Sequence, residues 1–130
     1  MMKTQAHRPT DAELEILRVL WDRGSSTVRE VQENLEGRRP VGYTTVLKLM
    51  QIMTEKGLLE RDERERAHRY VPKATREQTQ QRLVSELLDR AFAGSASSLV
   101  MQALASRRAD PEELAAIRRM LEEIQQEEGR

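Results

Sequence analysis

The chain has 130 residues, of which 38% are hydrophobic and 34% charged, with four aromatic residues and no cysteine. This length excludes a large multi-domain enzyme and leaves room for one ordinary domain or two small ones, and the missing cysteines exclude disulfides, thiolate metal sites and cysteine nucleophiles. The formal net charge is zero, yet residues 38–73 hold nine Lys or Arg against five Asp or Glu, whereas residues 75–130 hold eight against ten, so the basic charge is concentrated in one block.

Three helices are predicted in the first part of the chain. Residues 10–13 read Thr-Asp-Ala-Glu, a capping box, and apolar residues at helical spacing continue the first helix to Gly24. A second capping box at residues 27–30 opens a shorter helix that Gly37 can end. After a loop that contains Pro40, a third helix is expected over residues 43–56.

Two short strands are predicted next, at residues 58–63 and 68–71, with Leu59 and Tyr70 on one face and charged residues between them. Three compact helices followed by a charged hairpin are typical of a winged helix-turn-helix domain, which we assign to residues 1–73. Pro72 and Lys73 mark its boundary.

Residues 74–130 are predicted to form a helical second domain. Its helices begin at a Thr75 capping box and at Asp110, which is followed by Pro111, and a short apolar helix covers residues 99–104 between them. The expected fold is therefore mainly α with a small β-hairpin: a winged helix-turn-helix plus a C-terminal three-helix dimerisation domain.

Apolar stripes on these C-terminal helices favour a homodimer, because three short helices cannot bury all of them alone. In the last helix the apolar residues alternate spacings of three and four, which is a heptad stripe of two repeats. The residues predicted to hold the dimer together are Leu83, Leu87, Leu88, Leu99, Leu114, Ile117, Leu121 and Ile124. A self-contained helical subdomain is the alternative.

The third helix has the two faces that a DNA-reading helix needs. At 100° per residue, Thr44, Lys48 and Gln51 point away from its apolar side. Lys can donate to guanine, Gln can pair with adenine, and the Thr methyl can meet the thymine methyl. Flanking residues predicted to contact phosphates or to complete this surface are Thr45, Tyr43, Arg38, Arg39, Arg61, Arg64, Arg66, His68 and Arg69.

Each of these features has a plainer interpretation. Lys48 and Gln51 could belong to an ordinary solvated helix face, and the arginines of the hairpin could pair with its carboxylates across the strands. A winged helix that binds a protein, with the Arg-rich hairpin docked on an acidic partner, is therefore the alternative function.

No pattern for catalysis or cofactor binding accompanies these motifs. His7 and His68 are the only histidines and lie far apart in sequence, and we find no nucleophile, Gly-rich phosphate loop or metal motif. We predict a protein that is not an enzyme and that binds no metal and no cofactor. A small-molecule-sensing repressor is less favoured, because three short helices offer little volume for a pocket of about 300 Å³ or more.

No apolar stretch approaches the roughly 20 residues of a membrane span, and the first ten residues are polar and lack the core of a signal peptide. We therefore expect a soluble, cytoplasmic protein with no membrane partner.

The segment Tyr-Thr-Thr-Val-Leu-Lys-Leu-Met-Gln-Ile-Met-Thr-Glu-Lys-Gly-Leu-Leu at residues 43–59 resembles the penicillinase repressor (BlaI/MecI) family. Residues 14–21, with Trp21, resemble the first helix of that family, residues 66–72 its returning wing strand, and residues 98–100 its dimerisation region. The resemblance extends over about residues 10–124.

Members of that family are dimers that bind palindromic operators through the winged helix and associate through three C-terminal helices. The resemblance thus implies a transcriptional repressor with double-stranded operator DNA as its partner, and it implies Thr44, Thr45 and Lys48 as the groove-reading residues. In the best-known members a β-lactam sensor triggers proteolysis at an Asn-Phe bond. Gln102-Ala103 stands at that point here, so these two residues mark the candidate cleavage region and a regulatory protease is a candidate partner.

Two departures qualify what the resemblance implies. The copper-responsive branch carries a C-terminal cysteine motif, which this chain lacks, so copper sensing by that route is disfavoured. Glu65 stands in the wing where members commonly have glycine, and a residue with a side chain there can change the conformation of the wing tip.

Overall fold

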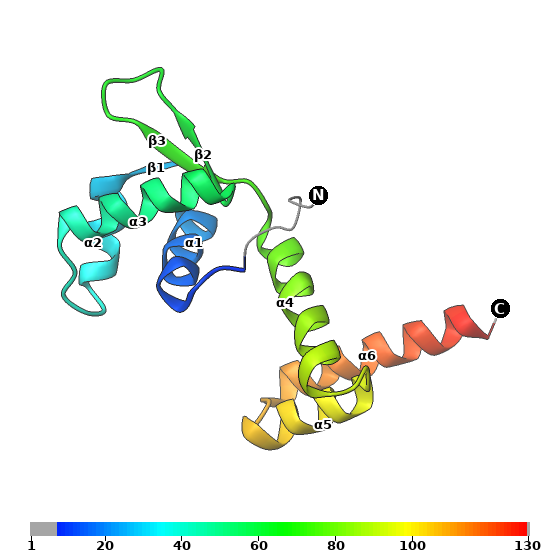
Figure 1. The fold of residues 1–130 in the computed structure, drawn as a ribbon. Coiled ribbons are helices and arrows are strands. Elements are labelled where there is room, and N and C mark those ends of the chain that lie inside the picture. The colour runs from blue at the N-terminus through cyan, green and yellow to red at the C-terminus, as the bar shows by residue number, and fades with distance from the viewer. Residues whose placement is uncertain (1–7, 130) are drawn as a thin grey trace. The chain divides into compact units, whose positions relative to one another are not determined.

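The computed structural model describes residues 8–129 and divides the chain into two compact units between Leu83 and Val84. The elements of the first unit are α1 (Asp11–Arg23), β1 (Ser26–Thr27), α2 (Val28–Glu36), α3 (Tyr43–Lys56), β2 (Leu59–Asp62), β3 (Arg69–Pro72) and the first half of α4 (Arg76–Ala91) (Figure 1). The second unit holds the rest of α4, α5 (Ala96–Ser106) and α6 (Pro111–Glu128).

The capping boxes predicted for α1 and α2 are confirmed. The Thr10 hydroxyl accepts the Glu13 amide at 3.2 Å while the Glu13 carboxylate accepts the Thr10 amide at 2.9 Å. Thr27 and Glu30 repeat this exchange at 3.1 and 3.0 Å. Each exchange satisfies two backbone donors that the first turn of a helix leaves without partners, so both helices begin where the sequence predicts.

Helix α3 has the bounds that the sequence predicts, residues 43–56. It ends because Gly57 adopts a left-handed conformation, with φ 85°, and its amide donates back to the carbonyls of Met53 and Thr54. Glycine reaches this conformation without the steric penalty that a Cβ would bring. The chain can therefore turn directly from α3 into β2.

The predicted hairpin belongs to a three-stranded antiparallel sheet in the order β1-β3-β2. Arg61 on β2 lies opposite Tyr70 on β3, and on the other side Tyr70 lies opposite Ser26 of β1. The expectation of two strands alone was incomplete, because a two-residue strand has no alternation that could reveal it. Strand β1 joins the segment that precedes α2 to the wing.

The core of the first unit lies between α1, α2, α3 and the sheet. Leu59 and Tyr70 are both buried, which confirms that they share the inner face of the hairpin. The buried apolar residues are Ile16, Leu17, Val19, Leu20, Val28, Val31, Leu35, Val46, Met50, Met53, Leu59 and Tyr70. The winged helix thus has a contiguous apolar core to which α1, α2, α3 and the sheet all contribute.

The start of α4 is held against α1. The indole Nε1 of Trp21 donates to the Ala74 carbonyl at 3.1 Å, and the Arg76 guanidinium lies 5.8 Å from the centre of the Trp21 ring. Arg76 also forms an ion pair with Asp22. The predicted Thr75 cap is present too, since the Gln78 amide donates to the Thr75 hydroxyl at 3.0 Å.

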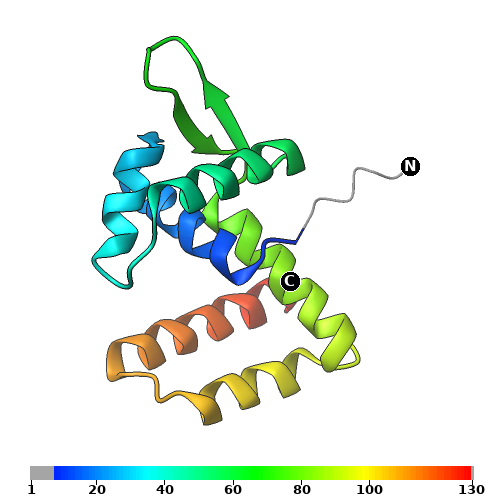
Figure 2. The same cartoon turned by 60° about the vertical axis from the view of Figure 1, so that its left-hand side comes forward.

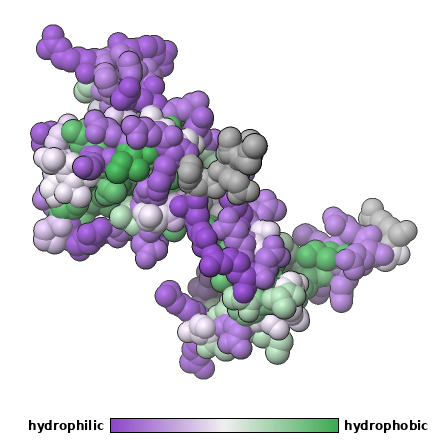
Figure 3. Space-filling view, in the orientation of Figure 1, coloured by the Kyte–Doolittle hydropathy of each residue, from purple (hydrophilic) through white to green (hydrophobic). Residues whose placement is uncertain are grey.

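The second unit has capped helices but no buried side chain among its described residues. Asp110 forms the predicted capping box with Glu113, and Ser95 caps α5, which begins three residues earlier than the sequence indicates. Helices α5 and α6 form a hairpin joined by residues 107–110 (Figure 2). Hydrophobic residues reach the surface of these helices (Figure 3), among them Leu121, which is 58% exposed.

No helix in the described part of the chain is both long and apolar enough to cross a membrane. The predicted functional division after residue 73 remains a prediction.

Candidate nucleic-acid interface

Helix α3 has one buried face and one exposed face. Val46, Met50 and Met53 on the inner face are fully buried, whereas Lys48 and Gln51 on the opposite face are exposed. Thr44 and Thr45 in the first turn are exposed as well. The helix therefore presents its polar residues outward while its apolar side fixes it to the core, as a groove-reading helix requires.

The N-terminus of α3 is open to a ligand. Its N-cap residue is Gly42, which supplies no side-chain hydrogen bond, so the amides of the first turn keep their donor capacity for water or an anion. Next to them the Arg29 guanidinium of α2 lies 5.0 Å from the centre of the Tyr43 ring. Backbone donors and a cation thus occur together at the exposed start of the helix.

The C-terminus of α3 is tied to α1 by a buried ion pair. The Lys56 ammonium lies 2.8 and 3.1 Å from the two carboxylate oxygens of Glu13, whose side chain is only 2% exposed. Burial on its own would raise the pKa of Glu13, but the bonds from Lys56 and from the Thr10 amide outweigh it, so the pKa lies below its usual value. One carboxylate therefore caps α1 and also fixes the end of α3.

The loop before α3 carries one paired and one unpaired arginine. Arg39 lies 2.6 Å from the Glu15 carboxylate on α1, and this bond lowers the pKa of Glu15. The Gln32 side chain of α2 donates to the Val41 carbonyl at 3.2 Å and so fixes the chain just before α3. Arg38 is exposed and forms no ion pair within the described part of the chain.

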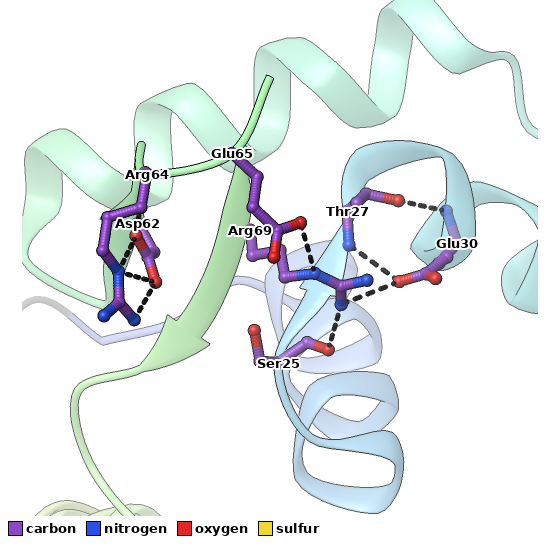
Figure 4. A network of polar contacts seen from close by, with 7 residues as sticks. All are labelled: Ser25, Thr27, Glu30, Asp62, Arg64, Glu65 and Arg69. Carbon is purple, nitrogen blue, oxygen red and sulfur yellow. Dashed lines mark hydrogen bonds and ion pairs between the residues drawn. The ribbon is translucent and has the colours of Figure 1, made fainter. Parts of the chain in front are cut away.

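Arg69 joins the wing to the segment that precedes α2 (Figure 4). Its Nη1 donates to the Ser25 carbonyl at 3.0 Å and lies 3.5 Å from Glu30, while its Nε lies 3.6 Å from Glu65 near the wing tip. The pKa of Glu30 is lowered, first by the bond from the Thr27 amide and then by the Arg69 charge. Arg69, which the sequence predicts to contact phosphate, is thus also part of the structure of the wing.

Arg64 is paired within the wing. Its guanidinium forms an ion pair with the Asp62 carboxylate, in which Nη2 lies 2.6 Å from Oδ2, and its backbone amide donates to the same carboxylate at 3.0 Å (Figure 4). These bonds lower the pKa of Asp62 to about 2. Arg61 similarly lies 2.6 Å from Glu63. Glu65, where the resembling family commonly has glycine, is exposed and faces Arg69.

The predicted cations therefore fall into two groups. Arg39, Arg61, Arg64 and Arg69 are held by carboxylates. The three wing arginines pair with wing carboxylates, as the plainer interpretation expected, but with partners two to four residues away and not across the strands. Arg38, Lys48, Arg66 and His68 are exposed, and their side chains form no hydrogen bond or ion pair with described residues. The surface of the wing is mostly hydrophilic in the view of Figure 3.

The residues predicted to hold a dimer together all lie on α4, α5 and α6. Leu87, Leu114, Leu121 and Ile124 are exposed, and Leu83, Leu88, Leu99 and Ile117 are half-buried. Gln102 and Ala103, the candidate cleavage region, lie inside α5, where the Gln102 carbonyl accepts the Ser106 hydroxyl at 2.7 Å.

Within residues 8–129 no three His, Cys, Asp or Glu side chains are grouped so as to hold a metal ion. His7, one of the two histidines weighed above, lies outside the described residues.

Sequence reasoning missed the residues that orient this surface. These residues, Glu13, Lys56, Glu30 and Arg29, act through partners that are distant in sequence; Glu13 and Lys56, for example, are 43 positions apart. For the two glutamates a partial signal existed, because each is the third residue of a capping box. No local pattern marks Lys56 or Arg29.

Comparison with known proteins gives a consistent result. The family model described as penicillinase repressor matches residues 9–123. A protein of Mycobacterium tuberculosis named transcriptional regulator BlaI is 35% identical over 123 residues, which is 92% of this chain and 86% of that protein.

The chain also resembles solved structures, two of which are of the repressor BlaI. The DNA-binding domain of the repressor BlaI is 26% identical, with a TM-score of 0.50 over 58% of this chain and 90% of that one. Monomeric BlaI of Bacillus licheniformis, in complex with the blaP half-operator, is 25% identical, with a TM-score of 0.50 over 56% and 89%. A MarR family protein of Bacillus stearothermophilus, at 20% identity and a TM-score of 0.51 over 95% and 78%, shares the fold.

Proposed function

The chain belongs to the penicillinase repressor family, and we propose that it is a transcriptional repressor that binds palindromic operator DNA as a homodimer. In this proposal α3 enters the major groove, where Thr44, Lys48 and Gln51 read base edges. Thr45, Tyr43 and the open N-terminus of α3 contact phosphates beside the groove, and the wing contacts the adjacent backbone.

The observation that carries the proposal is the polarity of α3. Its inner face is fixed by three fully buried side chains and by the Glu13–Lys56 ion pair, while its outer face exposes Lys48, which has no partner among the described residues. A rigid helix with an unneutralised polar face suits base reading, because few side chains have to be ordered or separated from carboxylates on binding. The BlaI of Bacillus licheniformis, solved with a half-operator, supports the same use of the fold.

Dimerisation is supported by the second unit. None of its described side chains is buried, whereas helices in proteins gain most of their stability from packing of an apolar face. A second copy would cover the stripe of Leu114, Ile117 and Leu121, and it would also make the second half-site an intramolecular target.

Release of the operator is proposed to follow either cleavage near Gln102–Ala103 by a regulatory protease or another signal. Both residues are exposed but helical. A protease binds its substrate in an extended form, so cleavage would require α5 to open locally.

The test has two steps. The full-length chain first selects duplexes from a random pool, and its affinity for the most enriched duplex is then measured by fluorescence anisotropy over a range of salt concentrations. We expect a palindrome whose half-sites are centred about one helical turn or a multiple of it apart. We also expect the logarithm of the affinity to fall linearly with the logarithm of the salt concentration.

Absence of binding to any duplex at low salt would overturn the proposal. In that case a winged helix that binds an acidic protein partner through its arginines becomes the better interpretation.

A further inference from the structure

We propose that the first unit contains a binding site for a small organic acid: a carboxylate attached to a short apolar body. The site is a cavity of about 300 Å³ between the end of α3, the segment that joins β3 to α4, and the first half of α4. Its occupancy is independent of the proposed DNA binding.

The cavity is built by segments that are far apart in sequence but adjacent in space. The Lys73 amide donates to the Leu58 carbonyl at 3.0 Å, so the segment that follows β3 is bonded to the turn that follows α3 (Figure 1). Gln78, Thr79 and Arg82 of α4 form a further wall. The volume lies at the lower end of the range typical of small-molecule sites, which excludes a nucleotide-sized ligand.

Leucines provide the apolar lining of the cavity. Leu17 of α1 belongs to the buried core, while Leu58 and Leu83 are half-buried and line the same space. An aliphatic chain of a few carbons placed there would leave water and gain apolar contact. Inorganic phosphate or sulfate would gain nothing from these three side chains, so the lining favours an amphipathic ligand.

Cations contribute to the polar part of the site, and two of them, Lys73 and Arg82, have no carboxylate partner among the described residues. No Asp or Glu is among the described residues that line the cavity. The ammonium of Lys56 is already bonded to Glu13, whereas Lys73 and Arg82 are exposed and form no ion pair with described residues. Two cations without ion-pair partners at the edge of an apolar cavity favour binding of an anion with an aliphatic chain over a neutral or cationic molecule of the same size.

The position of the cavity suggests what an occupant would influence. It touches Gly57 and Leu58, the turn directly after α3, and it also touches α4, a continuous helix that leads into the second unit. A ligand that contacted both would stabilise the packing of the first half of α4 against the end of α3. An effect of this kind on DNA binding rests on the proposed function, whereas binding of the ligand does not.

The experiment uses three probes with one chain length and different head groups: hexanoate, hexan-1-ol and hexylamine. Each is titrated into the full-length ¹⁵N-labelled chain, and the amide shifts are followed by NMR. Hexanoate should give saturable shifts at Gly57, Leu58, Lys73 and Thr79 at millimolar concentrations. The alcohol should bind about tenfold more weakly, because it lacks the charge-assisted bonds, and the amine should not bind.

The matched variants are Lys73→Gln with Arg82→Gln, which removes both free cations, and Arg90→Gln, which removes an exposed cation of α4 outside the cavity. The double variant should weaken hexanoate binding about tenfold or more, and Arg90→Gln should leave it unchanged. The proposal is overturned if hexanoate shows no saturable shifts, if the alcohol binds equally well, or if the double variant binds like the parent chain.

Discussion

The two units of this chain use their apolar residues in opposite ways. In the winged-helix unit twelve apolar side chains form a closed core, whereas in the second unit no described side chain is buried. The first unit thus has an apolar core of its own, and the homodimer proposed above would cover the apolar side chains that the second unit leaves accessible. The difference shows that helix caps do not by themselves bury apolar side chains, because α5 and α6 are both capped and still expose leucines.

The same contrast applies to polar residues. In the first unit a buried carboxylate, Glu13, is satisfied by a helix cap and by Lys56, so a charged group helps to define a single arrangement of α1 and α3. In the second unit the capping carboxylate Asp110 is exposed and acts only on its own helix. Long-range polar contacts thus specify the tertiary structure of the winged helix, while the second unit has mainly local ones.

Among substitutions that test this difference between the two units, Ile117→Asp should have the largest effect. If a second copy covers α6, the substitution places an unpaired charge in that interface, which costs about 3 to 5 kcal/mol. The dimer should dissociate in sedimentation at micromolar concentrations, and affinity for a full palindrome should fall towards that for a half-site.

Ile117→Val is the matched control and should leave the dimer intact, because position 117 requires an apolar side chain and not isoleucine in particular. An Ile117→Asp chain that sediments as a dimer would show that this stripe is not the interface.

A smaller effect, confined to the first unit, is expected from Glu13→Gln. The change leaves Lys56 half-buried without its carboxylate and should destabilise the unit by about 1 to 3 kcal/mol, independently of protein concentration. Glu15→Gln, which breaks the exposed pair with Arg39, should cost only about 0 to 1 kcal/mol. Urea unfolding at several protein concentrations measures both.

The free energy of unfolding should depend on pH in the direction that the lowered pKa of Glu13 dictates. The pKa of Glu13 is lowered in the folded chain, so its stabilisation is complete well above the unfolded value of 4.5 and is lost as the pH falls below 4.5 through the folded pKa. The difference between the parent chain and Glu13→Gln should therefore shrink on acidification from neutral pH to below pH 4.5. A difference that grew on acidification would contradict the assigned ion pair.

Local signals explain how much of this fold the sequence predicts. The capping boxes of α1 and α2, the glycine after α3 and the apolar periodicity suffice for the bounds of α1, α2 and α3, because all of these act within a few residues. Strand β1 has only two residues, and it is a strand because it pairs with β3, where Ser26 lies opposite Tyr70, 44 residues away. No local pattern carries that information.

The candidate interface, like the fold, has a part that local sequence patterns predict and a part that depends on residues distant in sequence. The outward face of α3 follows from helical geometry, so Thr44, Lys48 and Gln51 could be named from the sequence, and they are exposed. Which arginines are neutralised depends on three-dimensional neighbours, such as Glu15 for Arg39, 24 residues away. The cavity beside Lys73 and Arg82 likewise requires segments that meet only in the folded chain.

A third prediction separates base reading from phosphate contact within the first unit. Lys48→Ala should reduce the preference for the selected operator over random DNA by about 1 to 3 kcal/mol, while Arg66→Ala should weaken both alike and reduce the salt slope by about one. If reading belongs to the first unit alone, the Lys48 effect per half-site should be the same in the Ile117→Asp background. Anisotropy with half-site and full-site duplexes measures this, and equal losses on operator and random DNA would remove Lys48 from the reading set.

The smallest effect is expected from Glu65→Gln at the wing tip. The side chain is 70% exposed, so its charge is well screened, and Arg69 remains held by the Ser25 carbonyl and by Glu30 when that charge is removed. Loss of one negative charge near the DNA backbone should therefore raise affinity for every duplex about twofold to fivefold at low salt, with the gain vanishing at high salt. The same change at Glu127, in the last turn of α6, should alter nothing. A fall in affinity would mean that Glu65 serves DNA binding by orienting Arg69, and the wing would then need its carboxylates as much as its arginines.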